Sequence, residues 1–424
     1  MTGRTLEQWL DWQSSLNPRS IDLGLERVGQ VWRALGAPSP AARVVTVAGT
    51  NGKGSSVAFL EAIFREAGFA TGCYTSPHLQ RYNERIRVDG QMLDDASICE
   101  AFERIGQVRG NTALTYFEYG TLAAVLLFAD RSLDVAVLEV GLGGRLDAVN
   151  IIDADVALIT GIGLDHTDWL GDSLEKIGAE KAGIMRRGRP AVFAAPQMPD
   201  SIEQVAREKG AQLLRLGEDY RYSRTAESWS WRSASGGRRN ALPFPSMRGD
   251  IQLQNAAGVL QVLECLQQAM PVDQRALRGG LLSARARGRF ESYQRRCRWI
   301  LDVAHNPQAA QALASQLGDL FVAGRVHAVV GMLRDKDMLQ VLGLLSPQVD
   351  EWHLLDLARE HRGAGINDLR EALPENARGR ARPCDCLDTC LSDLDRATGE
   401  QDLVLVFGSF LSVGKAMAWL ETRR

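Results

Sequence analysis

The sequence predicts an α/β protein, with a mostly parallel sheet of the P-loop type followed by a second, smaller Rossmann-like α/β domain. Residues 44–56, VVTVAGTNGKGSS, have the pattern of a strand, a glycine-rich turn and a helix. Short β-branched runs alternate with helical patterns along the rest of the chain. A polar, basic segment, residues 283–289, precedes a second such series. Because parallel strands need crossover helices, this alternation predicts sheets whose sites lie at the carboxyl ends of their strands.

The composition is that of a globular protein with two or three domains, since the chain has 424 residues and is 45% hydrophobic. A net charge of −3 argues against a general nucleic-acid binder. No apolar run reaches the ~18 residues of a membrane span, and the first residues lack a signal-peptide core. We therefore expect a cytoplasmic, monomeric protein with no membrane partner.

The seven cysteines are an odd number in a long chain, which argues against a disulfide framework. Cys384, Cys386 and Cys390 cluster, but their spacing fits the usual metal-binding pairs poorly. We interpret them as reduced cysteines beside a helix start.

The first domain is expected to span residues 1–289, with two short helical patterns in residues 1–36. β-Branched or apolar runs predict strands at residues 44–47, 71–74, 85–88, 133–140 and 154–161. Helical patterns occupy residues 95–108 and 115–129, a stretch from near Ser173, and residues 252–269 and 273–283. Alternation within residues 218–240 predicts a hairpin insertion in which Trp229 and Trp231 share a packed face.

The second domain is expected to span residues 290–424. Its predicted strands are residues 299–303, 326–331, 350–355 and 402–407, with helices between them. Asn306-Pro307 has the pattern of a helix start, an N-cap residue followed by proline at the first helical position.

The glycine-rich turn after the first strand is a candidate phosphate site, formed by Thr50, Asn51, Gly52, Lys53, Gly54 and Ser55. Glycines let backbone N–H groups approach phosphate oxygens, and Lys53 supplies a positive charge. The match to G-x-x-x-x-G-K-[ST] is imperfect, because Val47 and Gly54 depart from it. A strand-to-helix turn without a phosphate is the alternative.

Three polar residues at strand ends are candidate ligands for a divalent ion: Ser76, Glu139 and His166. Glu139 ends an otherwise apolar run, so a cation is expected beside it. The alternatives are an ion pair between Glu139 and Arg145, and an N-cap or core role for His166. Lys181 lies in a helical pattern, where a solvated lysine is the ordinary interpretation.

Motifs along nearly the whole chain resemble those of the bacterial dihydrofolate synthase/folylpolyglutamate synthase family of Mur-type ligases. They are GTNGKGS, TSPHL with ERIRV, TYFEYGT, LEVGLGGRLDAVN, DHTDWLG, EKAGI and DVAHNP, in this order. Each motif is weak alone, but the ordered set is specific. The resemblance is weakest in residues 218–240 and at the C-terminal end.

The resemblance implies an ATP-dependent ligase that adds L-glutamate to dihydropteroate and to the γ-carboxylate of reduced folates through an acyl phosphate. It implies two Mg²⁺ ions, the first held by Ser76, Glu139 and His166. Lys181 matches a lysine that is carbamylated in family members and helps to hold the second ion. Lys53, His166 and Lys181 are thereby the expected catalytic residues.

The resemblance also assigns binding residues. ATP contacts are implied for residues 50–55 and for Asn255, Arg289, Asp302 and His305. Pterin contacts are implied for Asp22, Leu23, Gly24, Thr115, Tyr116, Phe117, Glu118, Leu146, Asp147 and Ala148. An aromatic ring and a carboxylate suit the flat pterin and its hydrogen-bonding edge.

Three other functions compete with this one. The chain could have folylpolyglutamate synthase activity only. A Mur ligase for a cell-wall nucleotide would need a uridine-binding N-terminal domain, whereas only residues 1–43 precede the first strand. A regulatory ATPase would need the loop and metal ligands but not the pterin motifs.

Overall fold

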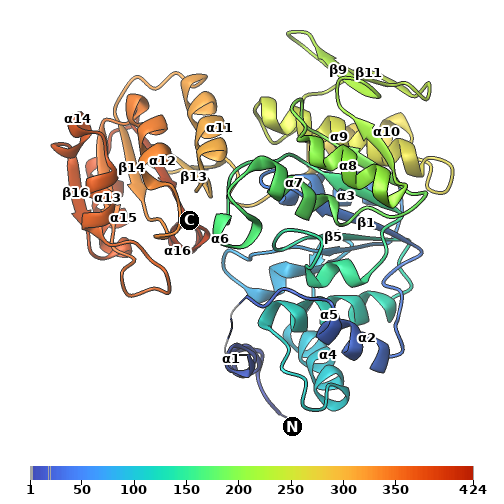
Figure 1. Ribbon diagram of the computed structural model, residues 1–424. Coiled ribbons are helices and arrows are strands. Elements are labelled where there is room, and N and C mark those ends of the chain that lie inside the picture. Colours follow the sequence, from blue (N-terminus) through green and yellow to red (C-terminus); the bar gives the residue numbers. More distant parts are fainter. Residues whose placement is uncertain (1–2, 18, 20, 424) are drawn as a thin grey trace. The chain divides into compact units, whose positions relative to one another are not determined.

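The computed structural model describes residues 3–17, 19 and 21–423 (Figure 1). These fall into two compact units. The first comprises Met1–Ser246 with Gln252–Arg285, and the second comprises Met247–Ile251 with Ala286–Arg424. Each unit has its own sheet, so the predicted α/β class with two sheet domains is confirmed.

The first unit is built on an eight-stranded sheet of order β4-β3-β2-β5-β1-β6-β7-β8. The six strands from β2 to β8 in this order are parallel, and β3 and β4 are antiparallel additions at one edge. The strands are β1 Arg43–Ala48, β2 Thr71–Tyr74, β3 Ile86–Val88, β4 Gln91–Met92, β5 Val135–Glu139, β6 Val156–Ile159, β7 Pro190–Phe193 and β8 Gln212–Arg215. Because β1 is central and its neighbours β5 and β6 come later in the chain, the turn after β1 lies at a switch point of the topology.

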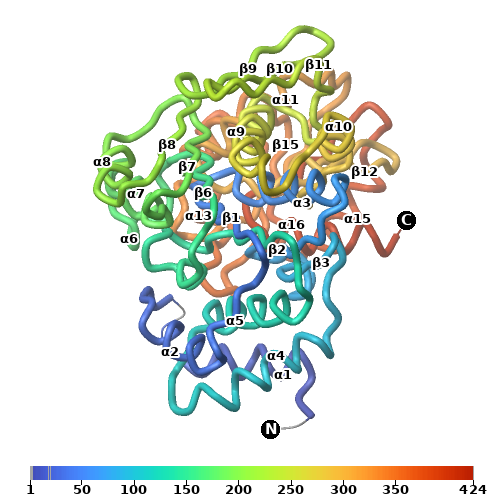
Figure 2. Tube along the Cα trace, turned by 90° about the vertical axis from the view of Figure 1, so that its right-hand side faces the viewer, coloured from blue at the N-terminus to red at the C-terminus, as the bar shows by residue number. Residues whose placement is uncertain are grey.

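Helices cover both faces of this sheet, with α4 and α5 on one side and α9 and α10 on the other (Figures 1 and 2). The helices are α1 Leu6–Leu16, α2 Glu26–Ala34, α3 Lys53–Glu66, α4 Asp95–Val108, α5 Tyr116–Ala129, α6 Thr167–Leu170, α7 Leu174–Ala182, α8 Asp200–Lys209, α9 Asp250–Leu266 and α10 Gln274–Ser283. Helix α5 is apolar almost all round because it is buried between the sheet and α1, α2 and α4. Its N-terminus is fixed by a capping box between Thr115 and Glu118.

The predicted hairpin insertion has a third strand that the sequence pattern did not reveal. The strands β9 Tyr220–Arg224, β10 Trp229–Ser233 and β11 Arg238–Leu242 form a separate antiparallel sheet. Trp229 and Trp231 are both buried, as the shared-face prediction required. Figures 1 and 2 show this small sheet beside α9 and far from α5.

The second unit contains a six-stranded sheet of order β12-β13-β17-β14-β15-β16. Its strands are β12 Glu291–Gln294, β13 Arg298–Asp302, β14 Val326–Val330, β15 Glu351–Leu355, β16 Ala381–Cys384 and β17 Leu403–Phe407. All pairs are parallel except β12 with β13. The helices are α11 Pro307–Gly318, α12 Met338–Leu345, α13 Ile366–Ala372, α14 Glu375–Arg378, α15 Leu387–Ala397 and α16 Phe410–Glu421. The predicted start at Asn306 is confirmed, since its side chain accepts from Ala309 N.

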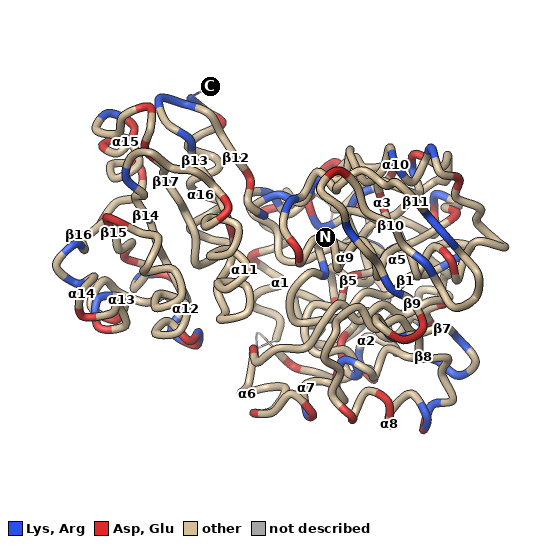
Figure 3. The backbone as a smooth tube through the Cα atoms, turned by 90° about the horizontal axis from the view of Figure 1, so that it is seen from above, with Lys and Arg blue, Asp and Glu red and all other residues tan. Residues whose placement is uncertain are grey.

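Charge and polarity are distributed as expected from the composition. Figure 3 shows basic and acidic segments interspersed along both units. Within the described residues, no helix combines the length and apolarity needed to cross a bilayer. The cysteines of residues 384–390 are free, and Cys386 occupies the N-cap position of α15, as the interpretation of a helix start required.

Candidate functional site

The turn after β1 is held in a conformation that only glycine readily adopts. Gly49 has φ +146° and Gly52 has φ +88°. A Cβ atom at Gly49 would lie 1.9 Å from Thr160 Oγ1, and one at Gly52 would lie 2.5 Å from Asn255 Oδ1. Gly52 is the N-cap of α3, so the first free N–H groups of this helix belong to the turn.

The segment after β6 supports this turn through hydrogen bonds. Thr50 N donates to the Gly161 carbonyl at 2.9 Å, and Thr50 Oγ1 exchanges 3.0 Å bonds with the backbone of Gly163. Thr160 Oγ1 donates to the Asn51 carbonyl at 2.6 Å. The motif pattern did not single out Thr160, because its role depends on pairing between β1 and β6.

Two lysines meet at the start of this turn. Lys53 Nζ donates to the carbonyls of Gly49 and Thr50 at 3.0 and 3.2 Å, and Lys181 Nζ donates to the Gly49 carbonyl at 3.0 Å. Lys181 is only 5% exposed, so the solvated-lysine interpretation is wrong. Burial, reinforced by the Lys53 charge, lowers the pKa of Lys181 to about 7.

Asn255 presents an unpaired oxygen beside this turn. The residue is buried on α9, and its Nδ2 donates to Gln252 Oε1 at 3.3 Å. Its Oδ1 atom has no hydrogen-bond partner. A buried acceptor without a donor is unfavourable, and a ligand donor at the turn would satisfy it.

Glu139 ends β5 next to β1 and is buried. Its Oε2 atom accepts a 3.4 Å hydrogen bond from Ser76 N, which follows β2. Arg145 pairs instead with Glu180, at 2.7 Å, so the alternative ion pair between Glu139 and Arg145 is wrong. The structure thus brings Ser76 to Glu139 at adjacent carboxyl ends.

His166 follows β6 and is half-buried. It occupies the N-cap position of the short helix α6 with φ +51°, but its side chain makes no cap hydrogen bond. The N-cap alternative for this residue therefore holds for its position and not for its side chain. The strand order β2-β5-β1-β6 sets the segments of Ser76, Glu139, Lys53 and His166 at neighbouring strand ends.

The segments assigned to the pterin meet beside the N-terminus of α5. Arg27 pairs with Asp22 at 2.7 Å and with Glu118 at 3.0 Å, which links the two predicted segments. Burial is the main cause that raises the pKa of Glu118, and Arg27 opposes it. Arg27 lies in no motif, so this bridge could not be predicted from the sequence.

The pterin segment of residues 146–148 is joined to the segments of residues 22–24 and 115–118 through backbone and ring contacts. Gly24 N donates to the Leu146 carbonyl at 3.2 Å. The partly buried Phe117 ring packs against Gly141, where a Cβ atom would lie 2.6 Å from Phe117 Cζ. Asp147 accepts from Leu142 N and Val149 N, and burial raises its pKa to about 6.

The remaining assigned residues of this unit have simpler placements. Leu23 is half-buried, Ala148 is buried in the α5 core, and the Tyr116 ring packs edge-on against Tyr82. Ser55 is buried in α3, and Gly54 faces Glu139, because a Cβ atom there would lie 3.8 Å from Oε2.

Two of the assigned residues of the second unit, Arg289 and His305, lie beside Phe410. The Arg289 guanidinium lies 5.6 Å from the Phe410 ring centroid, and the His305 ring lies 6.1 Å from it. Asp302 accepts from Phe290 N and Ala304 N, both at 2.8 Å. Burial raises the pKa of Asp302, and Arg289 opposes this. Phe410 was not predicted.

Comparison with known families supports this organisation. The family described as the Mur ligase middle domain matches residues 47–258, and the Mur ligase glutamate ligase domain matches residues 288–410. The dihydrofolate synthase/folylpolyglutamate synthase of Escherichia coli K12 is 46% identical over 419 residues, covering 99% of this chain and 96% of that protein.

Two solved structures are similar over almost their full length. Escherichia coli FolC in complex with DHPP and ADP has a TM-score of 0.94 and 44% identity, covering 100% of this chain and 99% of the other. A bifunctional folylpolyglutamate synthase/dihydrofolate synthase with Mn, AMPPNP and L-glutamate bound has a TM-score of 0.91 and 45% identity, covering 99% and 98%. The chain belongs to the dihydrofolate synthase/folylpolyglutamate synthase family, built on the Mur ligase middle and glutamate ligase domains.

Proposed function

We propose that this protein is an ATP-dependent ligase that adds L-glutamate to dihydropteroate, giving dihydrofolate, and to the γ-carboxylate of reduced folates. The main support is the glycine-rich turn after β1, where Lys53 and Lys181 both contact the Gly49 carbonyl. The three joined segments of the predicted pterin site lie in the same unit. The relatives with this function match the chain from end to end. Dihydropteroate and reduced folates can react at one site, because each presents a carboxylate for phosphorylation.

The reaction follows from the poor reactivity of a carboxylate towards amines. A carboxylate oxygen of the acceptor attacks the γ-phosphorus of ATP, ADP leaves, and an acyl phosphate forms. The amine of glutamate then attacks the acyl carbon, phosphate leaves, and the amide nitrogen loses a proton. Lys53 stabilises the charge that develops on the phosphoryl oxygens, and the N–H groups at the start of α3 orient them.

The nucleotide contacts extend beyond the turn in this proposal. Asn255 offers an unsatisfied oxygen beside Gly52, where a ligand donor would pair with it. The family resemblance adds Arg289, Asp302 and His305 of the second unit. We assign the predicted domain of residues 1–289 to ATP and pterin binding and residues 290–424 to the glutamate ligase domain. The compact units divide between Arg285 and Ala286, so Arg289 falls in the second unit.

The metal proposal is supported by the buried carboxylate at the end of β5. Glu139, with Ser76 and His166, would hold a Mg²⁺ ion that neutralises phosphate charge when it is bound. Carboxylate oxygens are ligands that Mg²⁺ prefers, and the carboxylate of Glu139 stands at a strand end beside the Ser76 backbone.

A carbamylated Lys181 would supply an oxygen ligand for a second ion. The neutral amine nitrogen adds to the carbon of CO₂ and loses a proton, which leaves an N-linked carboxylate. The depressed pKa of about 7 favours the neutral amine that this addition needs. The charge at this position would change from positive to negative beside Lys53.

The pterin is assigned to the segments joined by Arg27. The Phe117 ring offers an apolar face, and the Asp22 and Glu118 carboxylates accept from the amine and amide groups of a pterin edge. Arg27 fixes both carboxylates and limits their freedom before the substrate arrives.

Phosphate release tests this function directly. Purified protein with ATP and Mg²⁺ is supplied with glutamate, dihydropteroate or tetrahydrofolate, alone and in pairs. We expect release only when glutamate is present with one of the two acceptors. If glutamate supports phosphate release with tetrahydrofolate but not with dihydropteroate, the protein has folylpolyglutamate synthase activity only. Phosphate release that needs no acceptor would indicate a regulatory ATPase.

A further inference from the structure

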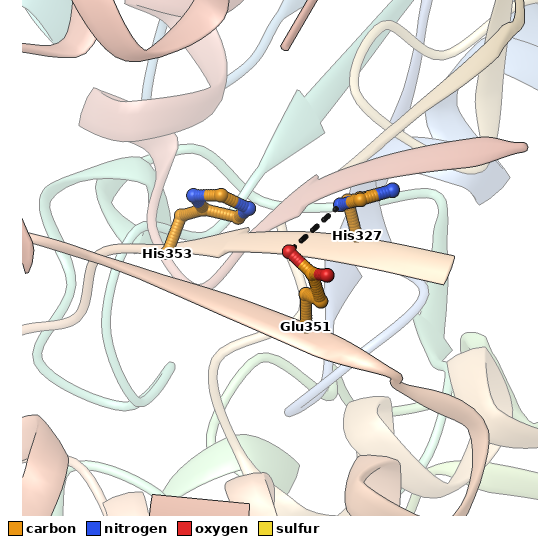
Figure 4. A group of neighbouring side chains, drawn as sticks. All are labelled: His327, Glu351 and His353. Carbon is orange, nitrogen blue, oxygen red and sulfur yellow. Dashed lines mark ion pairs between the residues drawn. The ribbon is translucent and has the colours of Figure 1, made fainter. Parts of the chain in front are cut away.

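Three side chains with metal-binding atoms share one face of the sheet in the second unit. His327 lies on β14 opposite Glu351 on β15, and His353 follows two residues later on β15. Because side chains alternate along a strand, Glu351 and His353 point to the same face. Figure 4 shows the Glu351 carboxylate between the two imidazole rings.

The ligand atoms of these three residues are close together. One nitrogen or oxygen from each lies within 4.8 Å of the others. Glu351 Oε2 is 3.7 Å from His327 Nδ1, and the two ring centroids are 6.0 Å apart. A tetrahedral ion with bonds of about 2.0–2.2 Å needs ligand atoms about 3.5 Å apart. Side-chain rotations that move these atoms by about 1 Å would bring them to that spacing.

Two imidazole nitrogens of this cluster are buried and make no hydrogen bond. His327 and His353 are 9% and 8% exposed, and neither His327 Nδ1 nor His353 Nε2 has a hydrogen-bond partner. A buried ring nitrogen left without a partner costs free energy, whereas a metal ion would satisfy both.

Two arginines also pair with Glu351 and would compete with an ion. Arg325 contacts Oε1 at 2.9 Å, and Arg382 contacts Oε2 at 3.4 Å. Both arginine side chains are 69% exposed, so these ion pairs contribute little. An ion bound through Oε2 would displace only Arg382, while Arg325 would keep its bond to Oε1 and orient the carboxylate.

We propose that His327, Glu351 and His353 bind one divalent transition-metal ion, with zinc as the best match. Two imidazoles and one carboxylate, with a fourth position for water, are a common three-ligand set for zinc. A set in which two of the three ligands are imidazoles favours zinc over Mg²⁺, which takes mostly oxygen ligands in octahedral geometry. The ion would connect β14 to β15, and none of its ligands belongs to the residues assigned to ATP or pterin.

Zinc titration of the full-length protein tests this proposal. The protein is stripped with a chelator and titrated calorimetrically in saturating Mg²⁺, and its melting curve is measured with and without zinc. We expect wild type to bind one more zinc equivalent than His353→Ala and to gain melting temperature with zinc. His361→Ala removes an exposed histidine of the same unit and should behave as wild type.

A second variant and a Co²⁺ absorption spectrum test the same metal site independently. If His353→Ala does not fold, Glu351→Gln replaces it, and Co²⁺ absorption of the wild type reports whether nitrogen and oxygen ligands surround the ion. Loss of the zinc equivalent in either variant supports the site. Equal zinc binding by wild type and both variants, or no binding by wild type, would overturn it.

Discussion

Lys181 donates a hydrogen bond to the carbonyl oxygen of Gly49, with its Nζ atom 3.0 Å away, and it is buried there. The same carbonyl accepts from Lys53 at 3.0 Å. Burial is the main cause of the lowered pKa of Lys181, and repulsion from the positive charge of Lys53 at the same acceptor lowers it further. This arrangement makes Lys181 chemically different from an ordinary helix lysine.

Carbamylation of Lys181 is the first prediction. Intact-mass measurement under conditions that preserve the adduct should show one added CO₂. Lys181→Glu should keep more activity than Lys181→Ala, because it restores a negative oxygen ligand with shorter reach. Lys176→Ala, which removes an exposed lysine of the same helix, is the control and should leave turnover unchanged. Full activity in Lys181→Ala would contradict the assignment.

Stability in CO₂-free buffer should depend on pH through the same residue. The folded-state pKa of about 7 lies below the ordinary value of 10.5, so the unfolded chain binds more protons between these values. Stability should therefore rise with pH across this window, by up to about 1.4 kcal/mol per pH unit. Denaturant unfolding of wild type and Lys181→Met measures the difference. Identical pH profiles for both would show that Lys181 titrates normally.

Lys53→Ala should lower ATP turnover by about 100- to 1,000-fold, because it removes the charge that stabilises the phosphoryl oxygens. Lys53 is half-buried at the start of α3 and lies outside the apolar core, so the variant should melt near the wild-type temperature. Phosphate release and circular dichroism measure the two effects. Normal turnover in the folded variant would refute the nucleotide assignment.

Glu139→Gln should weaken Mg²⁺ binding by at least about tenfold, since it keeps the shape and removes a charged ligand. Arg145→Ala is the matched control, because Arg145 pairs with Glu180 and should not affect the metal. Metal titration with melting curves distinguishes the residues. A Glu139→Gln protein that is less stable yet binds Mg²⁺ normally would indicate a purely structural carboxylate.

Arg27→Met should raise the KM for dihydropteroate and lower the melting temperature. The substitution removes both ion pairs and leaves the buried Glu118 without its guanidinium partner, a change that costs about 3 kcal/mol in buried pairs. Arg19→Met is the control, because Arg19 is 75% exposed and 3.7 Å from Asp22. If both variants keep the wild-type KM, the bridge does not position substrate.

Phe117→Ala should impair dihydrofolate synthesis more than folate extension, because the pterin ring must lie further out when a γ-carboxylate reacts. Phe117 also packs on Gly141 and lies 5.8 Å from the Tyr74 ring, so some loss of stability is expected. Steady-state kinetics with both acceptors separate these effects. Parallel loss of both activities and of melting temperature would assign Phe117 to packing alone.

The sequence predicted the strand ends of the site well, because β-branched runs and glycines are local signals. The runs before Gly49 and Glu139 mark β1 and β5, and parallel order then brings their ends together. Burial of Lys181 could not be predicted in this way. Its helix shows a lysine at an ordinary position, and only tertiary packing brings Nζ to the Gly49 carbonyl.

Contacts between distant segments could not be predicted from the sequence either. Arg27 contacts Glu118, which lies 91 positions further along the chain, and no local pattern marks such a bridge. The cluster of His327, Glu351 and His353 depends on the register of β14 against β15. The short strands β12 and β16 were missed because polar and charged residues interrupt their patterns.

Mass spectrometry of the reaction products shows directly whether this protein adds L-glutamate to dihydropteroate and to tetrahydrofolate. Wild-type protein is incubated with ATP, Mg²⁺ and L-glutamate, and with either dihydropteroate or tetrahydrofolate as acceptor. We expect dihydrofolate from the first acceptor and a glutamate-extended folate from the second, with both products lost in Lys53→Ala. Failure of the folded, metal-loaded wild type to add glutamate to either acceptor would contradict the proposed function.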